Sequence, residues 1–395
     1  MSEAYLVDGV RTPVGRYGGA LASVRPDDLA ALVVGETVRR STIPVEAIDE
    51  VILGAANQAG EDNRNVARMA VLLAGLPDSI PGLTVNRLCA SGMSAIALAA
   101  NAVRAGDADL IVAGGVESMT RAPWVQAKPE RAWAKPGAAF DTSIGWRFTN
   151  PRLSARDKAT FSMPETAEEV ARVDAISRTD ADAFALQSHQ RAIAAIDAGR
   201  FADEIVGVET SRGIVDTDEG PRRDTTLDAL ATLRAVVAGG EVVTAGNSSS
   251  LNDGSSAIVV ASAEAVERHG LRPRARIVAS ATAALAPEIM GLGPVPATQK
   301  ALAKAGLQVS DLGAVELNEA FASQSLACIR RLGLDPTIVN ADGGAIALGH
   351  PLGSSGSRLI VTLLGRIERE GARYGLATMC VGVGQGAAMI VERLP

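Results

Sequence analysis

The sequence predicts an α/β protein in which helices cover a buried, largely parallel sheet. Short runs of apolar, β-branched residues alternate with longer runs rich in alanine, leucine and valine, which is typical of βαβ units. The chain has 395 residues, 47% of them hydrophobic and only 3% aromatic, a composition of globular rather than disordered or fibrous proteins. This length is sufficient for two or three packed units.

The first alternating set ends near residue 119. It predicts strands over residues 5–7, 51–54 and 110–113, and helices over residues 29–39, 65–74 and 94–105. The next stretch, to about residue 243, holds all three tryptophans, irregular proline-containing segments and two expected amphipathic helices over residues 164–173 and 180–198. We interpret this stretch as an inserted loop domain.

A second alternating set follows the insertion. Strand-like sequence resumes over residues 257–261, and a further strand is expected over residues 274–281. The sequence therefore predicts a first half formed by residues 1–119 with 244–271, an inserted loop domain over residues 120–243, and a second half over residues 272–395.

The two halves are similar to each other. Ser91-Gly92 opens a helix that is followed by a glycine and the strand over residues 110–113; Ser355-Gly356 is followed in the same order by a helix, a glycine and a strand over residues 376–380. Such an internal repeat indicates two copies of one α/β unit. Loops at corresponding ends of two such sheets can face one another and form a shared cleft.

Composition excludes several classes of function. The formal net charge of −7 disfavours a nucleic-acid partner, because backbone phosphates require a dense basic face. Three scattered cysteines and three histidines offer neither a disulfide framework nor the ligand spacing of a metal site. The sequence contains no uncharged run of about 18 apolar residues, so we expect no membrane span. Neither terminus shows a targeting signal, and we therefore expect a cytoplasmic protein.

Cys89 is the first candidate for chemistry. It lies in VNRLCASGMSAI, between a β-branched run and a helix-prone run, so a strand-to-helix turn is expected there. The unpaired N–H groups and the dipole of a helix N-terminus favour a thiolate over a thiol. A lone cysteine is, however, more often a small buried apolar residue.

Two further reactive residues lie on glycine-lined loops. His350, flanked by Gly349 and Pro351, suits a base held in one orientation, although a structural histidine would look the same. Cys380 follows an apolar strand and precedes VGVGQG, where its thiol would lie beside backbone N–H donors. Together with Cys89 they suggest a nucleophile, a base and an acid/base rather than three packing residues.

Other polar residues have more ordinary explanations. Asn318 either caps a helix or positions a water; Cys328 and His269 are assigned to packing and to the surface; His189 is assigned to a helix surface. The run CVGVGQG lacks the G-x-G-x-x-G spacing and a following βαβ unit, so a dinucleotide site is not expected there.

In combination, these segments resemble the thiolases, acyl-CoA C-acyltransferases with a Claisen-type mechanism. The resemblance covers nearly the full length. It rests on RTPVGRYGGAL from Arg11, the stretch around Cys89, VESM from Val116, TAGNSSSLNDG from Thr244, NEAFA from Asn318, GGAIALGHPLGSSGSR, and GLATMCVGVGQG. It implies two βαβαβαββ halves in an αβαβα arrangement, with a loop domain inserted in the first.

The resemblance also implies site residues. Cys89 would be the nucleophile, His350 the base that activates the CoA thiol, and Cys380 the acid/base acting on the acetyl-CoA enolate. One oxyanion hole would combine His350 Nε2 with a water held by Asn318, and the other the backbone N–H groups of Cys89 and Gly382. Coenzyme A is then a substrate, and neither a cofactor nor a metal is required.

The same resemblance implies contacts to CoA and the acyl chain. Arg222, in DEGPRRDTTLDAL, would lie against the adenine and Ser249 against the pantetheine, while Met163, Ala320 and Phe321 would line the substrate path. The chain departs from the usual GNASG, reading GNSSS, with Ser250 in place of glycine. The partners expected are CoA thioesters and further copies of the chain, as a homodimer or homotetramer with residues 63–69 at the dimer contact.

Substrate choice within the family has two interpretations. RYGGALASVRPDDLA, ANQAGEDNRNVARMA, FDTSIGWRFTNP and CVGVGQG resemble the 3-oxoadipyl-CoA thiolases of aromatic catabolism. Short-chain acetoacetyl-CoA thiolases, the alternative, commonly carry a His-Met pair where this chain has Ser162-Met163. Three more distant alternatives are a β-ketoacyl synthase, a non-catalytic acyl-CoA-binding relative and a nicotinamide-dependent oxidoreductase. The first is disfavoured because Cys380 stands where that family would have a histidine.

Overall fold

A computed structural model describes residues 3–395 of the chain. Its strands are β1 (Ala4–Arg11), β2 (Gly15–Arg16), β3 (Glu50–Gly54), β4 (Gly82–Val85), β5 (Leu110–Ser118), β6 (Trp124–Gln126), β7 (Ala139–Asp141), β8 (Val208–Thr210), β9 (Gly213–Val215), β10 (Asn252–Ser262), β11 (Ala275–Ala284), β12 (Leu312–Leu317), β13 (Tyr374–Val381) and β14 (Gln385–Arg393). The expected strands and helices of both halves are present, with ends shifted by a few residues.

The α-helices are α1 (Pro26–Ser41), α2 (Val66–Leu73), α3 (Ser91–Ala105), α4 (Pro151–Ser154), α5 (Met163–Val173), α6 (Arg178–Asp197), α7 (Leu227–Ala231), α8 (Ala263–His269), α9 (Pro294–Ala305), α10 (Ala322–Leu332), α11 (Ala345–Leu348) and α12 (Leu352–Arg369). Short 3₁₀ turns are η1 (Val45–Ala47), η2 (Pro287–Leu292) and η3 (Val309–Asp311).

The largest sheet has the order β12-β13-β14-β11-β1-β10-β5-β3-β4, with β2 beside β10. The expectation of a largely parallel sheet is wrong. Only β3 pairs in parallel with β4 and β5, and β12 with β13, whereas the other ladders of this sheet within the described chain are antiparallel. The physical reason differs between the halves: β13 and β14 are joined by a short hairpin turn, which requires antiparallel pairing, whereas β5 and β10 are joined by the long inserted segment, which allows the chain to return in either direction.

The two halves repeat one connectivity. In the first, β1, α1, β3, α2, β4, α3, β5 and β10 follow one another, which is βαβαβαββ. In the second, β11, α9, β12, α10, α12, β13 and β14 follow the same order, and the missing strand is represented by a parallel bridge between Val315 and Val339. The halves meet where Tyr5 and Leu6 of β1 pair with Arg276 and Ala275 of β11.

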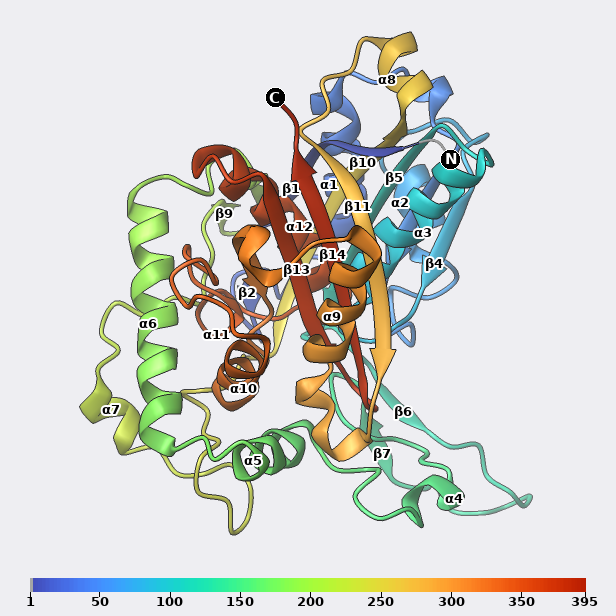
Figure 1. Cartoon of the computed structure of the whole chain (residues 1–395). Coiled ribbons are helices and arrows are strands. Elements are labelled where there is room, and N and C mark those ends of the chain that lie inside the picture. The colour runs from blue at the N-terminus through green and yellow to red at the C-terminus, as the bar shows by residue number, and fades with distance from the viewer. Residues whose placement is uncertain (1–2) are drawn as a thin grey trace.

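Five layers result. Ile258 and Val260 of β10 and Met389 and Val391 of β14 pack in one central core with α3 and α12. The alternate residues of β10 pack against α1 and α2 in a second core, and those of β14 pack against α9 and α10 in a third. Figure 1 shows α9 on the outer face of β11, β13 and β14. The αβαβα arrangement predicted by the family resemblance is confirmed.

Helices α3 and α12 cross at their N-terminal ends through glycines. A Cβ atom on Gly356 would lie 2.4 Å from Met93 N, and one on Gly92 would lie 2.6 Å from Ser357 Oγ. The segment Leu88–Ala105 is long and apolar enough to cross a membrane by those two criteria alone, with a mean hydropathy of 1.3. Its helix belongs to the central core between the two halves, and this position accounts for its apolar character.

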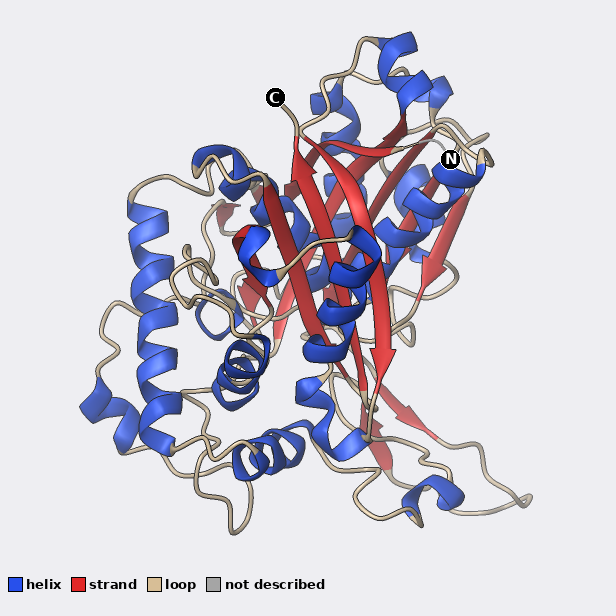
Figure 2. Ribbon diagram, viewed as in Figure 1, coloured by secondary structure: helices blue, strands red, loops and turns tan. Residues whose placement is uncertain are grey.

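The segment between β5 and β10 lies outside the layers of the two halves. Figure 1 shows α6 standing beside the second half, with α5 and α7 near its end, and Figure 2 shows that the lobe around β6, β7 and α4 consists mostly of loops. Arg11 of β1 connects the first half to this segment: its guanidinium forms ion pairs with Glu204 at 2.6 Å and Asp218 at 2.7 Å, both of which lie between β5 and β10.

Candidate active site

Cys89 lies in a tight turn between β4, which ends at Val85, and α3, which begins at Ser91. Leu88 has a φ of 48° there, in the left-handed region that non-glycine residues seldom occupy. The turn is stabilised by Ser91 Oγ, which accepts from Arg87 N at 2.9 Å and donates to Leu88 O at 2.6 Å. The predicted strand-to-helix turn is confirmed.

The effect expected from the backbone N–H groups is present at Cys89, but burial outweighs it. The residue is partly buried, yet the protein around its thiol raises the pKa to about 11, because desolvation outweighs hydrogen bonds from the backbone N–H groups of Gly382 and of Cys89 itself. The thiol is therefore neutral at physiological pH. A base must remove its proton when it reacts.

His350 lies between α11 and α12 and is 5% exposed. Its backbone N–H donates to Asn252 Oδ1 at 2.9 Å, and its Nδ1 lies 2.6 Å from Ser355 Oγ. The Ser355 hydroxyl donates its single proton to Pro351 O at 2.9 Å. Because this hydroxyl donates to Pro351 O, we assign it as the acceptor from His350, which puts the ring proton on Nδ1 and the lone pair on Nε2.

The Nε2 atom of His350 faces Asn318. Asn318 Nδ2 lies 3.4 Å from Nε2 and can donate to its lone pair. Burial, together with the charge of Arg358, lowers the pKa of His350 to about 3, so the imidazole is neutral. This lone pair is thus available to accept a proton.

Asn318 is not a helix cap. The N-cap position of α10 is Phe321, three residues further on, so that explanation is wrong. Asn318 N donates to Thr378 O at 3.0 Å, and this bond joins its loop to the strand that carries Cys380. Within residues 3–395, Asn318 Oδ1 is buried without a hydrogen-bond partner.

Cys380 lies near the end of β13, just before a hairpin turn of three residues that leads to β14. Gly382 begins the turn, and Val383 within it has a φ of 61°, which is strained for a β-branched residue. Burial and the proximity of Cys89 raise the pKa of Cys380 well above its ordinary value. CVGVGQG thus forms the end of β13, the hairpin turn and the start of β14.

The hairpin turn lies against the Cys89 turn. A Cβ atom on Gly382 would lie 2.9 Å from Leu88 Cδ1 and 3.9 Å from Met163 Sδ. A larger residue would displace the end of the Leu88 side chain, and with glycine the backbone N–H of residue 382 reaches the Cys89 thiol. The two cysteines on β13 and before α3 therefore belong to one site.

Apolar side chains surround Cys380. Met163, at the start of α5, and Ala320 and Phe321, before α10, pack with it in one cluster, together with Ala167, Val243 and Met290. Ser249 joins this wall through its backbone, because Ser249 N donates to Ala320 O at 3.0 Å. The structure brings these four predicted substrate contacts together beside the cysteine.

Ser250 keeps an ordinary backbone despite replacing the expected glycine, since its φ is not positive. Its hydroxyl contacts Asn252 Oδ1 at 3.0 Å, the same atom that accepts from His350 N. The serine therefore adds a polar contact to the residue that positions His350.

Arg222 lies apart from these residues, on an exposed loop before α7. Its backbone N–H donates to His189 Nδ1 at 3.2 Å. The assignment of His189 to a helix surface is wrong, because this residue of α6 is only 6% exposed. The loop over residues 218–224 covers this face of α6, and the periodicity of the helix could not reveal that. Cys328 is buried, as expected.

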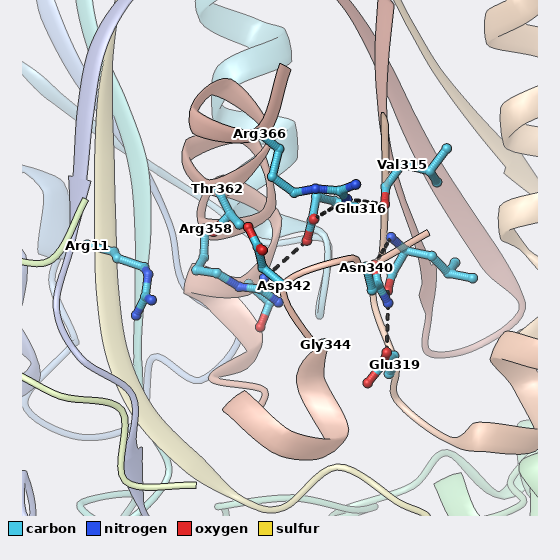
Figure 3. A network of polar contacts seen from close by, with 12 residues as sticks. Arg11, Val315, Glu316, Glu319, Asn340, Asp342, Gly344, Arg358, Thr362 and Arg366 are labelled. Atoms are coloured by element: carbon cyan, nitrogen blue, oxygen red, sulfur yellow. Dashed lines mark hydrogen bonds and ion pairs between the residues drawn. The ribbon is translucent and has the colours of Figure 1, made fainter. Parts of the chain in front are cut away.

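A buried polar network supports the loops of the second half (Figure 3). Glu319 accepts from Asn340 Nδ2 at 2.8 Å and from Ser188 Oγ at 2.6 Å, and so fixes the segment after Asn318. Deeper, Glu316 of β12 pairs with Arg366 at 2.8 Å and lies 3.6 Å from Arg358. Burial raises the pKa of Glu316 to about 7 in spite of these two cations.

Sequence reasoning missed Ser355 and Asn252, which hold His350 from either side. Both lie within quoted motifs, GHPLGSSGSR and SSSLNDG, but nothing in their spacing distinguishes them from neighbouring serines and asparagines. Within residues 3–395, no group of three or more His, Cys, Asp or Glu side chains has the arrangement of a metal site.

Comparison with known proteins agrees with this geometry. The family model "Thiolase, N-terminal domain" matches residues 4–264, and "Thiolase, C-terminal domain" matches residues 271–393. The chain is 56% identical over 402 residues to the 3-oxoadipyl-CoA/3-oxo-5,6-dehydrosuberyl-CoA thiolase of Escherichia coli K12, with 100% of both chains covered. It is also 56% identical over 400 residues to the beta-ketoadipyl-CoA thiolase of Pseudomonas aeruginosa, with 99% of both covered.

Among solved structures, human mitochondrial 3-ketoacyl-CoA thiolase in complex with CoA superposes with a TM-score of 0.93 at 38% identity, covering 100% of this chain and 98% of that one. The similarity to thiolases thus extends over the full length of the chain, including both halves and the segment inserted in the first. The chain belongs to the thiolase family and is an acyltransferase.

Proposed function

We propose that this enzyme cleaves 3-oxoadipyl-CoA with CoA to acetyl-CoA and succinyl-CoA, or runs the reverse Claisen condensation. The observation that carries the substrate assignment is the 56% identity, over the full length, to relatives named as 3-oxoadipyl-CoA and beta-ketoadipyl-CoA thiolases. The chemistry rests on the hydrogen bonds that leave His350 Nε2 with a lone pair.

In the first step, His350 Nε2 takes the proton of Cys89 as the sulfur attacks the 3-keto carbonyl. Because the pKa of the thiol is raised and that of the imidazole is lowered, proton transfer occurs with the attack and not before it. The oxyanion develops on the oxygen of C3, the carbon that is bonded to Cys89 Sγ, and it is stabilised by the backbone N–H groups of Cys89 and Gly382 beside that sulfur.

The C2–C3 bond then breaks, and its electron pair forms the enolate of acetyl-CoA. Cys380 donates its proton to C2. Because its pKa is raised, the Cys380 thiol remains protonated until the C2–C3 bond breaks. The enolate oxygen is stabilised by His350, now protonated on Nε2, and by a water held on Asn318, whose Oδ1 has no partner in the described chain. The proton on His350 then passes to the Cys380 thiolate, which restores both groups. In the second half-reaction, His350 takes the proton of an incoming CoA thiol, whose sulfur takes the succinyl group, and returns that proton to the departing sulfur of Cys89.

The proposed substrate contacts are those that the family resemblance implies, and the positions of four of the five residues beside Cys380 support them. Met163, Ala320 and Phe321 line the acyl and pantetheine path beside Cys380, Ser249 contacts the pantetheine, and Arg222 contacts the adenine. The runner-up is a short-chain acetoacetyl-CoA thiolase. We also propose the domain limits predicted above, a homodimer or homotetramer, and a cytoplasmic location.

The test is thiolytic cleavage of acetoacetyl-CoA, 3-oxohexanoyl-CoA and 3-oxoadipyl-CoA at saturating CoA, with Cys89→Ala as control. We expect kcat/KM for 3-oxoadipyl-CoA to exceed the others at least tenfold, a difference of about 1.4 kcal/mol in transition-state binding. Preference for acetoacetyl-CoA would establish the runner-up, and full activity in Cys89→Ala would refute the mechanism.

A further inference from the structure

His189 is a buried histidine for which the proposed mechanism has no use. It lies on α6, and its Nδ1 accepts the backbone N–H of Arg222 at 3.2 Å. A backbone N–H can only donate, so Nδ1 carries the lone pair and the ring proton is on Nε2. The histidine thus holds one defined point of the loop in front of α7.

The preceding part of that loop is fixed by other contacts. Asp218 accepts from both guanidinium nitrogens of Arg11, at 2.7 and 2.9 Å. Glu219 accepts from Arg16 N at 2.9 Å, and Arg16 Nη2 donates to Gly220 O at 3.1 Å. A Cβ atom on Gly220 would lie 2.2 Å from Ala347 O of α11, so the loop packs closely there. Beyond Gly220, His189 is the next anchor.

Arg222 itself is free to meet a ligand. The residue is exposed, and within residues 3–395 its guanidinium has no hydrogen bond or ion pair to the protein. Its neighbour Arg223 differs, because it pairs with Asp197 on the surface of α6. A fixed backbone at Arg222 therefore limits where its unpaired guanidinium can lie.

The charge state of His189 suits this contact. Desolvation, followed by the charges of Arg222 and Arg16, lowers its pKa to about 4, and Asp224 opposes the shift. The imidazole is consequently neutral at physiological pH and keeps its acceptor.

We propose that His189 is a positioning residue for the nucleotide end of CoA: through Nδ1 it fixes the backbone of Arg222, so that the guanidinium lies where the adenine binds. The proposal rests on the proposed function, in which Arg222 contacts that group. His189 touches no reacting atom. Its loss should thus weaken binding of the nucleotide and leave the chemistry of the thiol untouched.

The test compares two acyl acceptors at a saturating 3-oxoacyl-CoA donor: CoA, and N-acetylcysteamine, which has the thiol and amide end without the nucleotide. In His189→Leu we expect the ratio of kcat/KM for CoA to that for N-acetylcysteamine to fall about tenfold, or about 1.4 kcal/mol. His189→Asn keeps an acceptor at this position and should restore most of the ratio. Asp197→Ala, which removes only the exposed pair with Arg223, is the matched control.

A double-mutant cycle tests whether His189 acts through Arg222. In an Arg222→Ala background, His189→Leu should lower the ratio little further, since the positioned group is already absent. If His189→Leu fails to fold, His189→Ala removes the same acceptor. An unchanged ratio, or an equal loss with both acceptors, overturns the proposal. Absence of thiolysis in the unaltered enzyme would instead refute the proposed function.

Discussion

His350 keeps one tautomer because the Ser355 hydroxyl has a single proton, which it donates to Pro351 O. Because the Pro351 carbonyl can only accept, the Ser355 hydroxyl is the donor to it and the acceptor from His350 Nδ1. The same logic applies to His189, where a backbone N–H dictates the opposite tautomer. The hydrogen-bond partners of these two buried, neutral imidazoles thus select different tautomers: the acceptor is Nε2 in His350 and Nδ1 in His189.

Ser355→Ala should lower kcat about 10- to 100-fold, because Nδ1 loses its partner and the base is no longer held with Nε2 toward the site. Ser355→Thr, which keeps a hydroxyl, should restore activity. The matched control is Ser354→Ala: that hydroxyl is equally buried but contacts Ser256. Steady-state kinetics across pH measure the effect, and equal losses in the two alanine variants would show that Ser355 is merely structural.

At the scale of the elements, the site depends on where α3 and α12 cross. Cys89 precedes α3 and His350 precedes α12, and the two helices approach through Gly92 and Gly356. Because a glycine has no side chain, the two N-termini come closer than ordinary helices would allow. The separation of nucleophile and base is thus set by helix packing as well as by the loops.

Gly356→Ala should destabilise the fold by about 3 kcal/mol, since its Cβ would lie 2.4 Å from the backbone nitrogen of Met93. Gly365, on the same helix, has no atom within 4 Å of the corresponding position. Gly365→Ala should stabilise the helix by about 0.5–1 kcal/mol. Urea unfolding of both variants checks this, and similar effects of the two substitutions would contradict close packing at the crossing.

These elements show what the sequence could predict. The alternation of apolar runs revealed the strands and helices of both halves, and the small residues after Cys89 revealed its turn. The raised pKa of Cys89 could not be foreseen, because it results from burial of the thiol in the folded protein, which the local sequence does not show. Likewise, helical periodicity could not show that a distant loop covers His189. The catalytic roles themselves remain proposals.

At the scale of the whole molecule, buried ion pairs join segments far apart in sequence. Arg11 is 1% exposed and lies between Glu204 and Asp218, which belong to the segment inserted between β5 and β10. In the second half, Arg366 and Glu316 join α12 to β12 (Figure 3). These contacts hold the loops around the site in fixed positions relative to the sheet.

Arg11→Met should cost about 3–5 kcal/mol of folding free energy, because two buried carboxylates would lose their cation. Arg268→Ala serves as control, since it breaks only an exposed pair with Asp109 and should cost less than about 1 kcal/mol. Thermal and urea unfolding measure both changes. Equal losses of stability would mean that the Arg11 pairs do not hold the insertion in place.

The central claim is that Cys89 carries the acyl group, and one measurement addresses it directly. The enzyme is mixed with 3-oxoadipyl-CoA without free CoA, quenched in acid, digested and analysed by mass spectrometry. We expect one succinyl group on the peptide that contains Cys89, and none in Cys89→Ala. A succinyl group on Cys380 or Cys328 instead, or an unmodified Cys89 peptide while acetyl-CoA is released, would contradict the account.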